Sequence, residues 1–224
     1  MLWYKGWLET RLRVVFVLAM VAYSVALTHW GPIRSASAQK LVETLLIFWM
    51  IVPIMLGGAG IKTAAAFRTV KGMHGSMLYT LTLPVSRLRL VLVRAGIGFF
   101  EMAGVFLVTS IAAWLLSPVL KVHATYTDAL ENALVLTICS SVVYFISVLL
   151  ATFLDDVWQI WTSAIAVAAL RLIPSPSPFN LFQTMGDGSP LLTHSLPWTT
   201  MGISVTAAAI LFWGAVKIAE AREY

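Results

Sequence analysis

The residues of this sequence that could do chemistry are few, and most of them fail the pattern that their chemistry requires. Residues 57–63 (GGAGIKT) come close to a phosphate-binding loop, but that loop needs a glycine immediately before its lysine, and Ile61 occupies this place. An apolar segment precedes these residues, whereas the phosphate-binding loop follows a strand. We therefore expect no nucleotide site here, so any ATP must be hydrolysed by another polypeptide.

A nucleophile beside a base is suggested by His74 and Ser76, but neighbours this close in a helix do not face each other. No carboxylate is placed to orient His74. The four histidines of the chain lie outside its long apolar segments or at their edges, and no acidic or histidine cluster has metal-ligand spacing. The sequence predicts a chain that is not an enzyme and that carries no cofactor or metal of its own.

Glu101 is the informative polar residue, because it lies about three turns into the apolar segment 90–116. A carboxylate within a membrane costs several kcal/mol unless it is paired, protonated or in contact with water. Two interpretations stay open. Glu101 lines a pathway or locks two helices together, or it lies near the interface and pairs with Arg94 or another nearby base.

The elements that must position these residues are predicted to be membrane helices. The chain is 59% hydrophobic and only 11% charged, with a mean hydropathy of +0.87, whereas a soluble domain has about 25% charged residues. We predict an all-α integral membrane protein of about six transmembrane helices, which form a single domain over residues 1–224. The net charge of +5 fits cationic residues beside membrane spans, and no nucleic-acid-binding motif is present.

The predicted spans are mostly apolar runs of 16 to 27 residues, and a bilayer crossing needs about 20. The predicted spans are residues 14–30, 41–59, 90–116, 129–154, 158–173 and 199–219. Residues 1–13, rich in Trp, Tyr, Lys and Arg, are predicted to form a short amphipathic helix on the membrane surface or an ordinary flank of the first span. Residues 36–38 (ASA) could end a signal peptide, but the polar stretch before them favours a retained first helix.

The distribution of basic residues predicts the orientation. With the N-terminus in the cytoplasm, eleven of the fifteen Lys and Arg residues lie inside, and only Arg34, Lys40, Lys121 and Arg171 lie outside. This bias follows the positive-inside rule. The prediction is a multi-pass protein of the cytoplasmic membrane with both termini in the cytoplasm.

Several local signals refine this topology. Pro53 should bend the second span. Asp155 and Asp156 form a tight acidic turn between the fourth and fifth spans, on the cytoplasmic side. The last external loop, residues 174–197, is rich in Pro, Ser and Gly, and its PSPSP run cannot form a regular helix. Cys139 is a lone cysteine within an apolar run, so we interpret it as a packing residue.

The long cytoplasmic loop, residues 62–89, is predicted to contain a short amphipathic helix that ends before Pro84. The apolar residues on one face of this helix are Met73, Met77, Leu78 and Leu81. Such a face could dock into a groove on a cytoplasmic partner. The alternative is a helix that only covers the inner ends of the bundle.

The stretch Gly75–Arg87 (GSMLYTLTLPVSR) resembles the first internal loop of the permease subunits of ATP-binding-cassette exporters of the type-2 branch. In that family a Gly-Thr-like pair, a Leu-rich turn and a Pro-Val-Ser-Arg sequence recur before the third span. Six spans, an amphipathic N-terminal helix and cytoplasmic termini also match. The resemblance covers most of the chain in topology but only these thirteen residues in sequence.

The resemblance implies that the loop helix is a coupling helix that contacts a separate cytosolic ATPase subunit, which binds ATP and Mg²⁺. The residues of this contact would be Arg68, Lys71, Met73, His74, Met77, Leu78 and Leu81, with Asp155 and Asp156 as secondary candidates. Two permease chains, identical or different, would pair to form one pathway for a hydrophobic or amphipathic substrate.

The sequence departs from the family in one respect, since the family often has glutamates just before the Gly-Thr pair, where this chain has Arg68 and Lys71. This difference affects the expected polarity of the ATPase contact. Two other function classes are a membrane-embedded enzyme or assembly or processing factor, and an ion-driven carrier. Both usually require several convergent polar or charged residues inside the spans, and only Glu101 lies well inside one.

Overall fold

All regular elements in the described part of the chain are α-helices. The computed structural model describes residues 2–30, 37–57, 87–154, 156–174 and 177–221. The helices are α1 (Leu2–Trp30), α2 (Ala38–Leu56), α4 (Arg87–Leu116), α5 (Pro118–His123), α6 (Tyr126–Ala151), α7 (Asp156–Arg171), α8 (Leu181–Met185), α9 (Pro190–Thr193) and α10 (Trp198–Ala221). Five of these, α1, α2, α4, α6 and α10, are long and apolar enough to cross a membrane. The predicted fold class, an all-α membrane protein, is confirmed.

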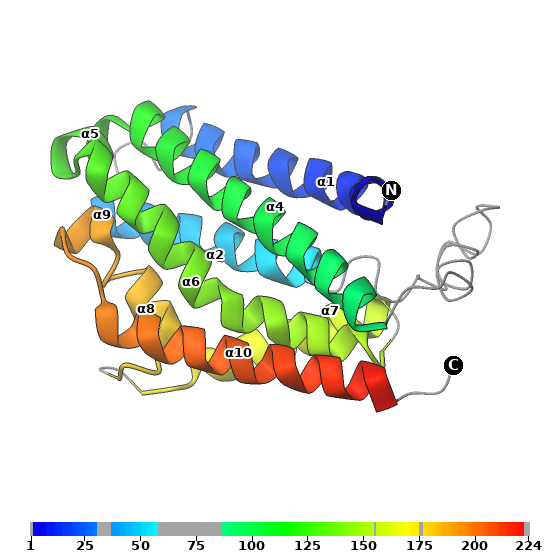
Figure 1. Ribbon diagram of the computed structural model, residues 1–224. Helices are drawn as coiled ribbons and strands as arrows, with labels where there is room; N and C mark the ends of the chain where they lie inside the picture. Colours follow the sequence, from blue (N-terminus) through cyan, green and yellow to red (C-terminus); the bar gives the residue numbers. More distant parts are fainter. Residues whose placement is uncertain (1, 31–36, 58–86, 155, 175–176, 222–224) are drawn as a thin grey trace.

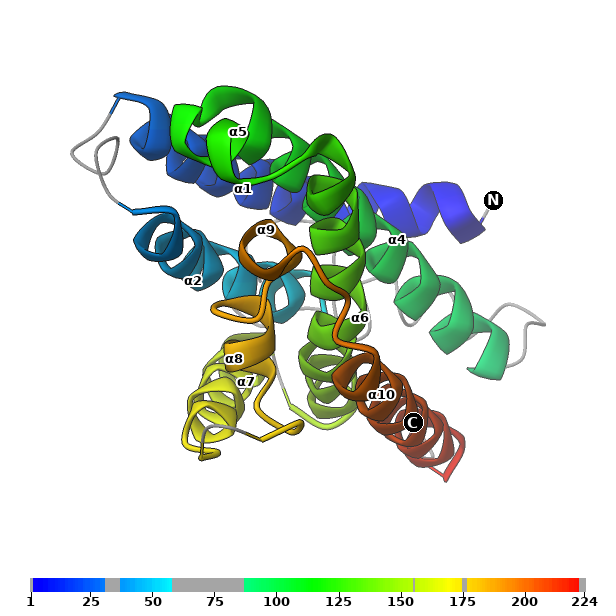
Figure 2. The ribbon, with the colours of Figure 1, turned by 90° about the vertical axis from the view of Figure 1, so that its left-hand side faces the viewer.

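The long helices lie side by side along one axis, with α6 in the middle (Figures 1 and 2). Helix α6 contacts α2, α4, α7, α8, α9 and α10. Its span is 61% buried inside the protein, whereas the spans of α1 and α10 are each 28% buried. The fold therefore places α6 among the six helices that it contacts, with more of its span buried than that of α1 or α10.

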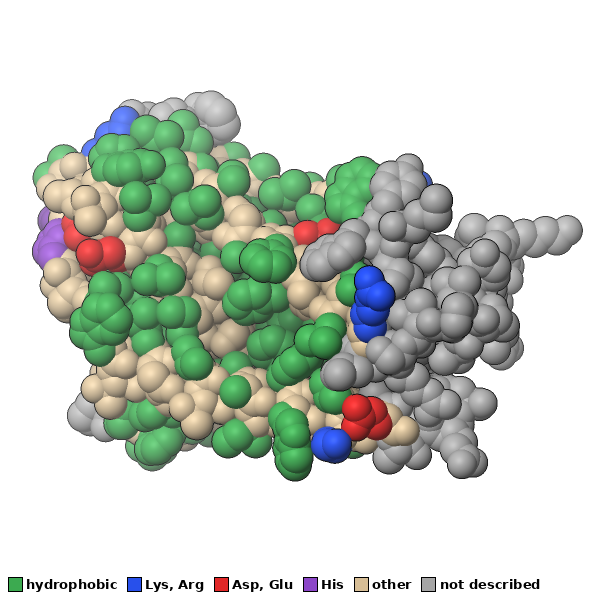
Figure 3. All heavy atoms as spheres, viewed as in Figure 1, with side chains coloured by type: hydrophobic (Ala, Val, Ile, Leu, Met, Phe, Trp, Pro, Cys, Tyr) green, Lys and Arg blue, Asp and Glu red, His purple; other side chains and the backbone are tan. Residues whose placement is uncertain are grey.

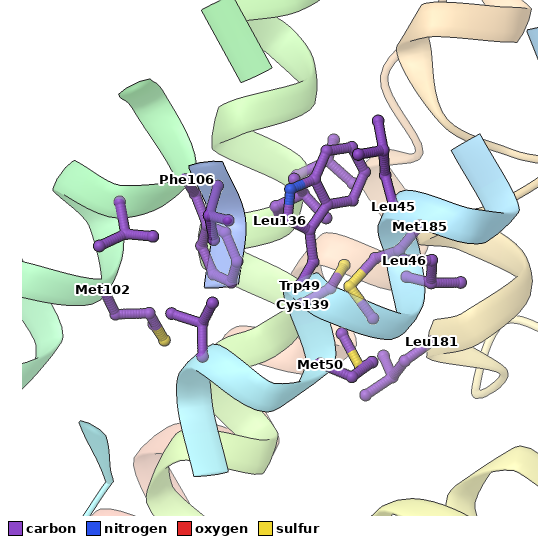
Figure 4. Close-up of a cluster of buried hydrophobic side chains, with 14 of the residues drawn as sticks. Leu45, Leu46, Trp49, Met50, Met102, Phe106, Leu136, Cys139, Leu181 and Met185 are labelled. Atoms are coloured by element: carbon purple, nitrogen blue, oxygen red, sulfur yellow. The ribbon is translucent and has the colours of Figure 1, made fainter. Parts of the chain in front are cut away.

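The central core joins α2, α4, α6 and α8 (Figure 4). Trp49, Phe106, Leu136 and Met185 are fully buried there, together with the thiol of Cys139. The interpretation of Cys139 as a packing residue agrees with this position. Between helices that lie in lipid, such close contacts supply dispersion energy without a hydrophobic driving force.

Helix starts follow from local capping signals. The hydroxyl of Thr125 accepts a hydrogen bond from the backbone N–H of Asp128, and the Asp128 carboxylate accepts one from the backbone N–H of Thr125, so a capping box begins α6. Helices α5 and α9 each begin with a serine N-cap followed by proline at the first helical position, Ser117 for α5 and Ser189 for α9.

Predicted and observed boundaries differ most at the N-terminal end of the chain. Helix α1 runs without interruption from Leu2 to Trp30, so the predicted surface helix 1–13 and first span 14–30 form one helix. No Gly or Pro lies between Trp7 and Trp30 to end a helix. The first turns of α1 are seen nearly end-on in Figure 1 while the remainder lies along the bundle, so the helix changes direction near its N-terminal end.

The predicted fifth span, residues 158–173, corresponds to α7, which has 16 residues. At about 1.5 Å per residue it extends about 24 Å, which is short of the ~30 Å hydrocarbon core. The described helices that can span a membrane thus number one fewer than predicted. Beyond α7 the predicted external loop 174–197 contains α8 and α9, which the sequence analysis did not expect.

Apolar side chains cover the middle of the face shown in Figure 3, and Lys, Arg and His side chains lie towards its two ends. Large exposed residues of this kind occur on every long helix, among them Phe16, Ile47, Phe100, Leu134 and Ile210. A soluble protein seldom exposes a continuous apolar surface of this extent. The surface suits a lipid environment and a multi-pass membrane protein.

Candidate functional site

The residues predicted to contact an ATPase fall mostly outside the described part of the chain. The coupling-loop residues Arg68, Lys71, Met73, His74, Met77, Leu78 and Leu81 belong to residues 58–86, and Asp155 also lies outside the described residues. Asp156 is the first residue of α7. The structure does describe the helices on either side of the loop, where α2 ends and α4 begins, at the same end of the bundle (Figure 1).

Glu101 lies on α4, partly buried and directed at α1. The hydroxyl of Thr10 on α1 donates a hydrogen bond to Glu101 Oε1 at 2.6 Å, and Thr10 itself is 3% exposed. The other carboxylate oxygen, Oε2, is buried and has no hydrogen-bond partner among the described residues. Glu101 therefore links α1 to α4, and sequence reasoning did not identify Thr10 as its partner.

The C-terminal end of α2 receives side-chain hydrogen bonds from two other helices. Pro53 lies in the last turn of this helix, and Gly57 closes it with a backbone N–H that donates to the carbonyl oxygen of Pro53 at 2.9 Å. The last carbonyl groups of a helix have no partner within the helix and need one elsewhere. Here the partners are side chains of other helices.

Two helices supply these donors. Gln159 on α7 donates through Nε2 to the carbonyl oxygens of Gly57 at 3.0 Å and Ile54 at 3.4 Å. Arg13 on α1 donates through Nη1 to the carbonyl oxygen of Met55 at 3.2 Å. The end of α2 is thus capped from α7 on one side and from α1 on another.

Close packing against α6 and α4 holds the same end of α2. A Cβ atom at Gly57 would lie 2.5 Å from the Cβ of Ser147 and 2.9 Å from the carbonyl oxygen of Tyr144, both on α6. A Cβ atom at Gly98 of α4 would lie 3.1 Å from the carbonyl oxygen of Leu56. Only glycine permits these approaches of backbone to backbone.

Tyr144 connects α6 to α4 at this level. Its hydroxyl donates to the carbonyl oxygen of Ala95 at 2.7 Å, and the side chain is 1% exposed. The ring makes edge contacts with Phe99 and Phe145. We call the set Arg13, Gly57, Gly98, Tyr144 and Gln159 the α2 junction.

A second polar group lies towards the other end of α6. The side-chain amide of Asn132 donates to the hydroxyl of Ser110 on α4 at 3.0 Å, and the hydroxyl of Ser189 donates to Asn132 Oδ1 at 2.8 Å. All three side chains are fully buried. About two turns along the helix, Ser140 donates to the sulfur of Met185 on α8 at 3.6 Å. Helix α6 thereby holds the α8–α9 segment against the bundle.

The outer edge of this segment carries an acid–histidine contact. His194 Nδ1 lies 2.8 Å from Asp128 Oδ2, and His194 adopts a positive φ of 53° as the C-cap of α9. A nucleophilic site would need a hydroxyl on the other ring nitrogen, but the neighbouring Ser195 hydroxyl donates to Thr193 instead. The contact closes the end of α9 rather than forming a catalytic triad.

The polar contacts of the described residues mostly join one helix to another. In the described ranges no group of three or more His, Cys, Asp and Glu residues could hold a metal ion. Gln159 and Asn132 were not predicted as site residues from the sequence. Each is an amide side chain inside a predicted span, and this feature could have identified them. Comparison with protein families, with curated proteins and with solved structures gives no match for this chain.

Proposed function

We propose that this chain is the membrane-spanning permease subunit of an ATP-binding-cassette exporter of the type-2 branch. The observation that carries the proposal is the sequence of residues 75–87, with its Pro-Val-Ser-Arg ending, between the second and the third long helix. A second permease chain completes the pathway, and a cytosolic ATPase supplies the energy. The cargo is a hydrophobic or amphipathic molecule, which suits a chain whose long helices are mostly apolar.

The arrangement of the described helices supports this proposal. The first residues of α1 and α4 and the last residues of α2 and α10 gather at one end of the bundle (Figure 1). With that end in the cytoplasm, both termini and the loop between α2 and α4 face the same compartment, as an ATPase contact requires. The eleven basic residues assigned to this side agree with the positive-inside rule.

In the proposed mechanism the ATPase subunits close on ATP and displace the coupling helices, and the spans rock to open the pathway outward. The permease hydrolyses nothing itself. Its contribution is to convert a displacement at the cytoplasmic loop into a rearrangement of packed helices, which adopt discrete arrangements because their cores are close-packed.

Photo-crosslinking tests the loop contact. A benzophenone amino acid in place of Met77 should form a covalent adduct with a cytosolic protein that binds ATP, which mass spectrometry identifies. The same amino acid at Val122, an 83% exposed residue of α5 at the opposite end of the bundle, is the matched control. Adducts with lipid alone at position 77, or the same protein adduct at both positions, would count against the proposal.

One observation favours a second candidate, an ion-driven carrier. Glu101 is a carboxylate inside a membrane-spanning helix, and one of its oxygens is buried without a hydrogen-bond partner among the described residues. Carboxylates in such positions occur along proton and ion pathways. A carrier of this kind works without an ATPase, so the dependence of transport on a companion ATPase separates the two functions.

A further inference from the structure

Within the α2 junction, Gln159 joins α7 to the end of α2. The two helices have few other contacts. Helix α7 packs against α6, α2 and α8, and it exposes Trp158, Trp161 and Ile165 along its outer face. Its buried face carries two polar side chains one turn apart, Gln159 and Ser163. Ser163 bonds to Ser147 of α6 at 2.9 Å, and Gln159 bonds to the end of α2.

The side chain of Gln159 is used as a hydrogen-bond donor. It is fully buried, and its amide nitrogen reaches two carbonyl oxygens of α2. Its own oxygen, Oε1, makes no hydrogen bond with any described residue. A glutamine held only for packing would be replaceable by an apolar side chain of the same length, but these carbonyl groups would then lose their donor.

The position of the Gln159 hydrogen bonds in the chain relates them to the movement of the cytoplasmic loop. Gly57 is the last described residue before residues 58–86, which include the predicted coupling loop. A displacement of the loop reaches the described bundle at Gly57 on one side and at Arg87, the first residue of α4, on the other. At Gly57 the chain cannot slide freely, because Ser147 and the carbonyl of Tyr144 lie against it on the α6 side.

We propose that Gln159 is a positioning residue that makes α7 follow any displacement of the chain at Gly57, through the hydrogen bonds from its amide to the last carbonyl groups of α2. This inference rests on the proposed function and deepens it. It names Gln159 as the residue through which a movement of the ATPase-facing loop is passed to α7, the fifth predicted span. Arg13 holds the same helix end to α1, so a displacement is shared between α1 and α7.

A double-mutant cycle tests this coupling without any ATPase or cargo. Gly57→Ala displaces the end of α2, since its Cβ would lie 2.5 Å from Ser147. A trifluoromethyl tag on a cysteine in place of Leu172, the 83% exposed residue just after α7, reports the position of α7 by ¹⁹F NMR in lipid nanodiscs. The single native cysteine, Cys139, is buried and does not compete for the tag.

Gly57→Ala should change the chemical shift of the ¹⁹F signal at position 172. If that signal is split between two conformations of α7, the ratio of their populations should change by about threefold or more. The same substitution in a Gln159→Met chain should leave the signal as in Gln159→Met alone. Ser163→Ala is the comparison variant, because it breaks the other route from Gly57 to α7, through the Ser147 side chain that the new Cβ would meet, and the response to Gly57→Ala should survive in it. A tag at Ile210 on α10 should respond to none of these changes.

Two results would overturn the inference. The response to Gly57→Ala could persist in full in Gln159→Met, or it could be absent although the protein is folded. Gly98→Ala provides a second displacement at the α2 junction if Gly57→Ala does not fold, because its Cβ would lie 3.1 Å from the carbonyl oxygen of Leu56 and 2.5 Å from the hydroxyl of Tyr144. Because the cycle uses the purified chain alone, its outcome is independent of whether an ATPase partner exists.

Discussion

At the scale of single residues, the described bundle relies on side chains that hydrogen-bond to backbone carbonyl groups of neighbouring helices. Trp114 donates to the carbonyl of Ala124, and Tyr144 and Gln159 do the same for Ala95 and Gly57. A buried polar group must find a partner in a medium without water. Each such hydrogen bond therefore fixes the position of one segment relative to another with little loss of side-chain packing.

The Tyr144 hydroxyl provides the simplest test at this scale. Tyr144→Phe keeps the ring and its contacts with Phe99 and Phe145 but removes the donor to the Ala95 carbonyl. We expect the free energy of unfolding to fall by about 1 kcal/mol, measured as a lower midpoint of thermal denaturation in detergent. Tyr23→Phe is the control, because Tyr23 is 60% exposed. Equal midpoints for the two variants would contradict this assignment.

At the scale of elements, the α8–α9 segment depends on α6 for its place. It consists of two helices of five and four residues, which are too short to be stable alone. Their buried contacts with α6 run through Asn132 and Ser140. The segment should therefore be the first part of the described bundle to open when these contacts are weakened.

Asn132→Ala tests this dependence. It leaves the buried hydroxyls of Ser110 and Ser189 without their amide partner, and we expect a penalty of about 1–2 kcal/mol concentrated in the α8–α9 segment. Cleavage within residues 186–195 by added protease should accelerate by about tenfold. Thr137→Ala on the same helix is the control, because its hydroxyl bonds only to the carbonyl of Ala133 within α6. Similar cleavage rates in the two variants would refute the role of Asn132.

Sequence patterns predicted the long helices well and their connections poorly. The predicted spans 90–116 and 129–154 correspond to α4 and α6 within about three residues at each end, because long apolar runs without breakers specify membrane helices almost by themselves. The Ser-Pro pairs at positions 117 and 189 could have indicated α5 and α9. The bond of Gln159 to the end of α2 could not be foreseen, since it joins residues 102 apart in sequence through a backbone acceptor.

At the scale of the whole molecule, the architecture offers a route by which, in the proposed function, energy supplied by a partner would reach the helices. Helix α6 is enclosed by its neighbours, whereas α1, α7 and α10 lie at the periphery (Figure 2). In the proposed function, a push on the cytoplasmic loop enters at the end of α2 and divides between α1 and α7. The outer elements then move around α6, which keeps its place.

The central claim is that the chain works as a permease driven by a companion ATPase through its cytoplasmic loop. The most direct measurement is the ATPase activity that co-purifies with the tagged chain from its native membranes. We expect activity with the wild-type chain and its loss, together with the ATP-binding protein, when Met77, Leu78 and Leu81 are replaced by Asp, while Val122→Asp retains both. A partner that still binds the triple variant with unchanged turnover, or full transport by the purified chain alone, would contradict the account.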